Sequence, residues 1–103
     1  MNKALGLIGL AQKAGKVKAG EYLSMKALKE GMAYLFVIAS DTSEKAKARL
    51  QSACRVFECQ AVIYGSKEEL GHAIGAQSKS VICLTDQGFS KALLKILEQT
   101  EQS

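Results

Sequence analysis

Helical and strand patterns alternate from one end of the chain to the other, and proline is absent from all 103 residues. Apolar residues recur at helical spacing in five segments, at residues 2–14, 21–30, 44–57, 66–75 and 86–97. Short extended or apolar runs separate these segments, at residues 17–19, 34–39, 61–64 and 80–84. The alternation predicts an α/β fold, with helices on both faces of a small four-stranded mixed sheet that is mostly parallel.

Helix-start patterns follow three of the predicted strands. The segment Asp41–Glu44 is typical of a helix N-cap with a glutamate that reaches back, and Ser66 with Glu69 has the spacing of a capping box. Asp86 stands where the last helix would begin. Catalytic carboxylates often follow strands, but capping alone accounts for both Asp41 and Asp86.

Length and composition are those of one globular domain over residues 1–103. No apolar run approaches the roughly 18 residues that cross a membrane. Three cysteines without a C-x-x-C pair, together with a single histidine, predict neither a zinc site nor a disulfide framework. This cysteine usage favours a reducing, cytoplasmic compartment. Cys54 and Cys83 lie in apolar patterns and are expected in the core, whereas nothing marks Cys59 as a nucleophile.

Charge is distributed unevenly along the chain, which carries 14 basic and 10 acidic residues and a net charge of +4. Residues 1–55 hold ten Lys or Arg against four acids, and residues 56–103 hold four Lys against six acids. A basic half beside an acidic half is consistent with a polyanionic partner on one face. An ordinary solvated lysine surface explains the same numbers.

No arrangement of residues predicts catalysis. The segment Gly9–Val17 has two glycines and two lysines, but its spacing is wrong for a phosphate-binding loop, and Val17 stands where a magnesium-binding hydroxyl is needed. His72 sits inside a short predicted helix after Gly71 and is interpreted as a surface or half-buried residue, not as a general base. We therefore predict no enzyme activity, no catalytic residue, no cofactor and no metal.

The strongest local feature is a glycine-bounded basic segment that leads into the second helix. Lys16 and Lys18 precede Gly20, where this helix would start. Amide N–H groups at a helix N-terminus point toward anions, and the helix dipole adds positive potential there. Lys26 and Lys29 lie three residues apart on the outer face of the same helix. Together these residues predict a cradle for a phosphate backbone.

Five motifs follow one another along residues 3–97, at residues 15–20, 26–31, 35–42, 66–75 and 82–89. In this order they resemble the L7Ae/L30e superfamily of ribosomal proteins, and most of all its small bacterial YlxQ-type members. The resemblance implies a three-layer α/β/α sandwich that binds structured RNA, often kink-turns. Kink-turn binders of this superfamily open the second helix with G-x-N-E-x-x-K, in which Asn and Glu read base edges.

The second helix departs from that pattern at the two base-reading positions. Gly20 and Lys26 match it, but Tyr22 replaces the Asn and Leu23 replaces the Glu. Tyr22 either stacks on an unpaired base or packs against the first helix. The resemblance also implies RNA contacts from the loop at residues 40–43 and from the loop before the last strand, where Lys79 keeps the family's positive charge.

These observations predict a non-catalytic, monomeric RNA-binding protein that associates with ribosomal RNA and possible ribosomal-protein neighbours. The candidate RNA-binding residues are Lys16, Lys18, Gly20, Glu21, Tyr22, Lys26, Lys29, Ser43 and Lys79. The alternative is a protein-interaction module of the same fold that has lost kink-turn recognition.

Overall fold

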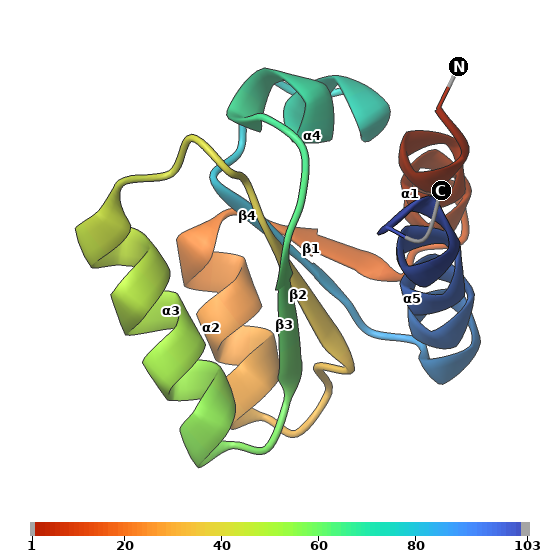
Figure 1. Ribbon diagram of the computed structural model, residues 1–103. Coiled ribbons are helices and arrows are strands. Elements are labelled where there is room, and N and C mark those ends of the chain that lie inside the picture. Colours follow the sequence, from red (N-terminus) through yellow and green to blue (C-terminus); the bar gives the residue numbers. More distant parts are fainter. Residues whose placement is uncertain (1, 102–103) are drawn as a thin grey trace.

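The computed structural model describes residues 2–101 and contains five helices and four strands in the order expected from the sequence (Figure 1). The elements are α1 (Lys3–Lys13), β1 (Val17–Ala19), α2 (Glu21–Lys29), β2 (Leu35–Ile38), α3 (Glu44–Val56), β3 (Gln60–Ile63), α4 (Lys67–Ala73), β4 (Val81–Leu84) and α5 (Gln87–Glu101). The described elements therefore confirm the predicted α/β architecture.

The four strands form one mixed sheet in the order β1-β4-β2-β3. Only β2 and β3 pair in parallel, whereas β4 runs antiparallel to both β1 and β2. The expectation of a mostly parallel sheet is wrong. The continuous apolar runs of β2 and β4 reflect the central position of these strands, which are buried on both faces, and burial does not report strand direction.

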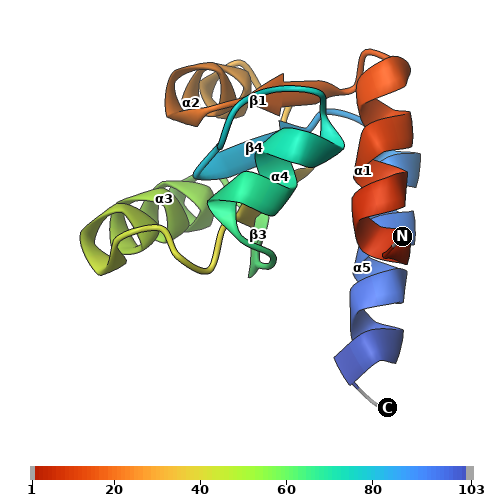
Figure 2. The same cartoon turned by 90° about the horizontal axis from the view of Figure 1, so that it is seen from above.

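Each face of the sheet carries its own hydrophobic core, because side chains alternate along the central strands. Leu35 and Val37 of β2 pack into one core with residues of α1, α4 and α5, whereas Phe36 and Ile38 pack into the other with residues of α2 and α3. Figure 2 shows α1 and α5 side by side on one side of the sheet, with α2 and α3 on the other. The result is the expected α/β/α sandwich.

Capping at the helix starts follows the sequence, with one exception. The Ser66–Glu69 capping box is formed, and Asp86 accepts a hydrogen bond from the Phe89 amide at 2.9 Å. The exception is Asp41, because Ser43 caps α3 instead. Asp41 accepts a 2.8 Å hydrogen bond from the amide of Lys67 and so joins the β2–α3 loop to the start of α4.

Candidate nucleic-acid interface

Three segments that are distant in sequence meet at one end of the sheet. The amide of Gly20, at the start of α2, donates a 2.9 Å hydrogen bond to the carbonyl of Val81. The carbonyl of Ser80 accepts hydrogen bonds from the Thr42 hydroxyl at 3.0 Å and from the Ala39 amide at 2.8 Å. The α2 N-terminus, the β2–α3 loop and the α4–β4 loop are thereby held together, and we refer to this region as the α2 edge.

Close packing against α4 positions the loop that carries Lys79. A Cβ atom at Gly71 would lie only 2.0 Å from the carbonyl oxygen of Gln77, so glycine is the residue that lets this backbone approach. The Ala76 amide donates to the Gly71 carbonyl at 2.8 Å, and the Lys79 amide donates to the Lys67 carbonyl at 3.0 Å. Lys67 and Lys79 are therefore neighbours at the α2 edge.

The start of α2 can accept an anion. Gly20 adopts φ 88° and ψ 164°, a backbone conformation that L side chains rarely take, and this allows the chain to turn directly from β1 into α2. No side chain among residues 2–101 caps this helix. Its first amides are therefore free of side-chain partners, and the positive end of the helix dipole lies at Gly20, whose amide bonds the carbonyl of Val81, two residues after Lys79.

The predicted lysines do not all lie at this edge. Lys18 is exposed on the edge strand β1, two residues before Gly20, and Lys26 and Lys29 are exposed along α2. Lys16 precedes β1 at the opposite end of the strand, about 13 Å of extended chain from Gly20. Lys16 is thus separated from the other candidates by the length of β1.

Tyr22 does not pack against α1. Its side chain is 78% exposed and lines a groove of about 600 Å³ between α2 and α3, together with Met25, Lys26 and Arg49. Of the two arrangements left open by the sequence, the structure therefore excludes packing on the first helix. Leu23, at the other base-reading position, is 44% exposed and supplies no polar atom.

Two basic residues near these candidates, Arg49 and Lys67, were not predicted from the sequence. Arg49 of α3 forms an ion pair with Glu21 of α2, at 2.6 Å between Nη2 and Oε1, and links the two helices. Lys67 lies beside Lys79, as described above. Each pairing joins residues remote in sequence, so no local pattern marks either cation. Ser43, the candidate from the β2–α3 loop, is exposed, and its hydroxyl caps α3 by accepting a hydrogen bond from the Ala46 amide.

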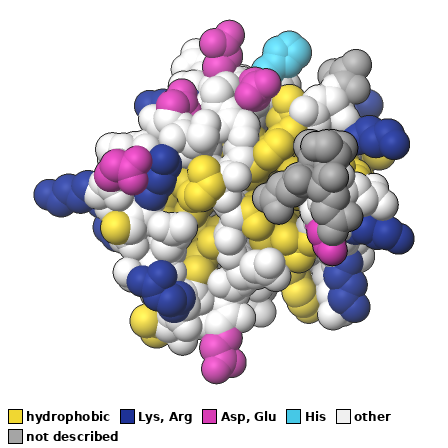
Figure 3. All heavy atoms as spheres, viewed as in Figure 1, with side chains coloured by type: hydrophobic (Ala, Val, Ile, Leu, Met, Phe, Trp, Pro, Cys, Tyr) yellow, Lys and Arg dark blue, Asp and Glu magenta, His cyan; other side chains and the backbone are white. Residues whose placement is uncertain are grey.

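Charges of both signs are present on the visible surface. On the face shown in Figure 3, acidic side chains are most frequent near α4 at the top, but others lie among the Lys and Arg side chains on the left and at the bottom. The groove between α2 and α3 is lined by three basic and two acidic residues: Lys26, Lys29 and Arg49, with Glu21 and Glu30.

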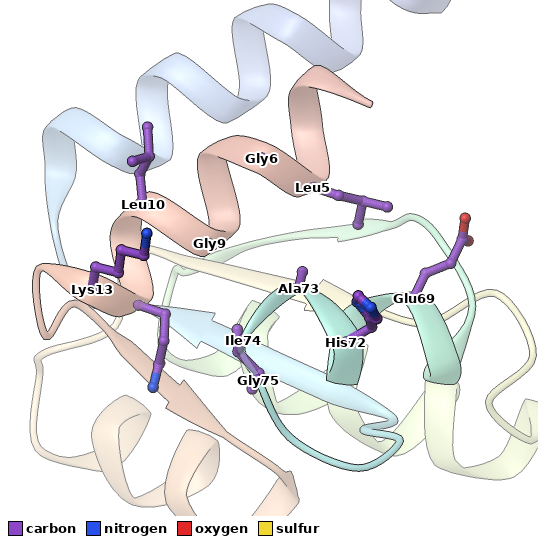
Figure 4. A pocket seen from close by; sticks show the side chains of 11 residues that line it. Leu5, Gly6, Gly9, Leu10, Lys13, Glu69, His72, Ala73, Ile74 and Gly75 are labelled. Carbon is purple, nitrogen blue, oxygen red and sulfur yellow. The ribbon is translucent and has the colours of Figure 1, made fainter. Parts of the chain in front are cut away.

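A second groove, of about 500 Å³, lies between α1 and α4 (Figure 4). Leu5, Leu10 and Ile74 contribute its apolar part, and Lys13, Glu69 and His72 contribute its polar part. Its charged groups are of mixed sign, and it does not include residues of the α2 edge. We therefore place the candidate interface at the α2 edge and along α2.

The cysteines belong mainly to the core beneath α2 and α3. Cys54 and Cys83 are buried, as expected, and Cys59 is partly buried. Burial raises the pKa of the Cys83 thiol to about 12. A hydrogen bond to Cys59, together with burial, raises the pKa of Cys54, and the same hydrogen bond lowers the pKa of Cys59.

Neither a clustered metal site nor a membrane span is found between residues 2 and 101. No three His, Cys, Asp or Glu side chains in this range are grouped so as to hold a metal ion. No helix in the same range combines the length and apolar character needed to cross a bilayer.

The geometry defines a class of protein: an α/β/α sandwich that presents one uncapped helix N-terminus and two adjoining loops at one end of a mixed sheet. Residues 2–94 match the model of the ribosomal protein L7Ae/L30e/S12e/Gadd45 family. The chain belongs to this family, which confirms the resemblance seen in its motifs.

Two relatives of this chain are an RNA-binding protein and a ribosomal protein. The RNA-binding protein YlxQ of Bacillus subtilis is 32% identical over 92 residues, which cover 89% of this chain and 92% of the relative. The large ribosomal subunit protein eL8 of Thermoplasma volcanium is 31% identical over 102 residues, which cover 97% of this chain and 84% of the relative.

Solved structures agree with the fold. A protein of unknown function from Bacillus halodurans C has a TM-score of 0.91 and 32% identity, with coverage of 95% of this chain and 99% of the other. The Giardia lamblia 15.5kD RNA binding protein has a TM-score of 0.76 at 24% identity, with coverage of 95% and 84%. At that identity, the second likeness supports the fold alone.

Proposed function

We propose that the chain is a non-catalytic, monomeric RNA-binding protein that associates with ribosomal RNA in the cytoplasm and needs no cofactor. The observation that carries the proposal is the α2 edge, where hydrogen bonds hold the α2 N-terminus at Gly20 and the β2–α3 loop against the loop that carries Lys79. The names of two relatives, an RNA-binding protein and a large-subunit ribosomal protein, support the same function.

Binding at this edge would be mainly electrostatic. The free amides of the first turn of α2 would donate hydrogen bonds to phosphate oxygens, and Lys18, Lys26 and Lys79 would add charge-assisted contacts around them. Phosphate contacts of this kind position a protein on RNA without reading its sequence. Shape and unpaired nucleotides would then supply the selectivity.

Tyr22 and Leu23 set the expected specificity for kink-turns. Neither side chain offers the amide or carboxylate that the family pattern uses to read base edges. We therefore expect a standard kink-turn to bind weakly, with little preference over a duplex. The double substitution Tyr22→Asn with Leu23→Glu should raise that preference in a titration of both RNAs. A wild-type protein with nanomolar, kink-turn-selective binding would contradict this argument.

Crosslinking in cells, followed by sequencing of the bound RNA, tests the function itself. We expect reads concentrated at discrete sites in ribosomal RNA, with the crosslinked peptides drawn from α2 and the α4–β4 loop. The absence of RNA enrichment over an untagged control would contradict the proposal.

The alternative, a protein-interaction module, has one structural argument in its favour. Met32, Tyr34, Val56 and Phe57 are exposed apolar residues near the ends of α2 and α3, away from the α2 edge. Exposed apolar side chains of this size are typical of protein contacts when they form a patch. Retention on ribosomal RNA at moderate salt separates the two functions, because only the RNA-binding protein is retained.

A further inference from the structure

The groove between α2 and α3 combines an apolar floor with cations on both walls. Met25 and the buried Leu50 form the floor, and the groove has a volume of about 600 Å³, within the usual range for small-molecule sites. Lys26 and Lys29 line it from α2, and Arg49 lines it from α3. The two helices lie on the same side of the sheet (Figure 1), and the groove continues directly from the α2 edge.

Tyr22 is the groove's exposed aromatic side chain. It is 78% exposed and makes no hydrogen bond within residues 2–101, so the fold does not require this large ring where it stands. An aromatic face left open to water is a platform on which a nucleobase stacks, whatever the base. Tyr22, Lys26 and Lys29 follow one another along one stripe of α2, over about 10 Å of helix.

Arg49 is held in position for a role at this groove. Its guanidinium donates to Glu21 at 2.6 Å, and the pair ties the wall on α3 to the first turn of α2. The ion pair leaves further N–H donors of the guanidinium for a ligand. Glu30 is the other acid of the groove, so the three cations outnumber the two acids and one of these acids is already paired.

We propose that this groove binds an unpaired nucleotide of the RNA, with the base stacked on Tyr22 over Met25 and the neighbouring phosphates held by Lys26, Lys29 and Arg49. This inference rests on the proposed function and adds a nucleotide subsite to it. A nucleotide is the ligand that uses a flat aromatic face and several cations together. An acidic peptide would use the cations but leave the Tyr22 ring without a partner.

Fluorescence anisotropy with two labelled RNAs tests the subsite. One probe is a hairpin with a single-stranded uridine loop, and the other is the blunt duplex made from the same stem. We expect Tyr22→Ala to weaken binding of the hairpin by about tenfold, the typical loss for one stacked base, while binding of the duplex changes less than about twofold. Tyr22→Phe keeps the ring and should bind both RNAs like the wild type.

Two further variants serve as controls. Tyr34→Ala removes another exposed tyrosine, 48% exposed and outside the groove, and should leave both affinities unchanged. Lys79→Ala removes a cation of the α2 edge and should weaken both RNAs equally. Melting temperatures measured for all variants establish that each one folds. A thiouridine in the hairpin loop should crosslink to the peptide that contains Tyr22 and Met25.

The outcomes separate the subsite from the function. An unchanged hairpin affinity for Tyr22→Ala, with both RNAs weakened by Lys79→Ala, overturns the nucleotide subsite and leaves the proposed function in place. An equal loss on hairpin and duplex also overturns it, as does displacement of the hairpin by an oligoglutamate peptide at lower concentration than by free uridine oligonucleotide. A wild-type protein that binds neither RNA overturns both proposals.

Discussion

Among the described glycines for which a Cβ contact is given, Gly71 is the one where an alanine Cβ would overlap most closely with neighbouring atoms. The new Cβ atom would lie 2.0 Å from the carbonyl oxygen of Gln77, 2.5 Å from its carbonyl carbon and 2.9 Å from the Cα of Ser78, whereas real Cβ contacts are essentially never under 3.0 Å. All three atoms belong to the backbone, so no side-chain rotation relieves the overlap. The α4–β4 loop would have to retreat by at least about 1 Å.

The expected cost follows from this displacement. Overpacking of a well-packed site costs about 1–3 kcal/mol. The retreating loop also weakens the hydrogen bonds from the amides of Ala76 and Lys79 to α4, each worth about 0.5–1.5 kcal/mol. The better helix propensity of alanine offsets about 1 kcal/mol of this loss of stability. We therefore expect Gly71→Ala to lower the free energy of unfolding by about 2–4 kcal/mol.

Urea denaturation followed by far-ultraviolet circular dichroism measures this change. Gly88→Ala is the matched control, because its Cβ would meet a single side-chain atom, the capping Oδ2 of Asp86, at 3.2 Å, and a shift of a few tenths of an ångström relieves this contact. The control should stay within about 1 kcal/mol of the wild type. A Gly71→Ala protein with wild-type stability, or an equal loss in the control, would refute the argument from close packing.

Three further predictions concern the interface and the thiols. Lys26→Ala should weaken RNA binding by about 1–2 kcal/mol, the range for a charge-assisted contact, and Lys91→Ala on α5 by less than about 0.5 kcal/mol, both measured on one RNA at one salt concentration; equal losses would indicate diffuse attraction without a site. If about four lysines neutralise phosphates, the logarithm of affinity should fall against the logarithm of salt concentration with a slope of about −3 to −4, and a flat titration would exclude the electrostatic cradle. A thiol reagent should label Cys59 first, because its lowered pKa gives it a larger thiolate fraction at a given pH. Cys54 and Cys83 are buried and have raised pKa values, so they should react only on unfolding. Rapid native-state labelling of all three would contradict the packing of this core.

Local patterns in the sequence account for much of the architecture. Hydrophobic periodicity predicted all five helices and four strands, because the residues that an element buries recur along the sequence with the period of that element. The Ser66–Glu69 capping box and the Asp86 cap are also local, since donor and acceptor lie three residues apart. The exposed positions of Lys26 and Lys29 on α2 follow from the same periodicity.

Strand direction and long-range partners required the tertiary structure. An apolar run looks the same in the sequence whether its strand is parallel or antiparallel to its neighbours. The antiparallel direction of β4 relative to β1 and β2 could therefore not be predicted from the pattern. The same holds for Asp41, which bonds the start of α4 across 26 residues, and for the Glu21–Arg49 pair across 28.

The class of fold, the family and a basic second helix are all predictable from residue spacing, because each depends on patterns within short chain segments. Which side chains share a surface is visible only in the folded chain: Tyr22 lies with Arg49 in a groove, and Lys67 neighbours Lys79 at the α2 edge. Such contacts depend on the placement of whole helices and loops, as at Gly71, where one missing Cβ lets a distant backbone approach.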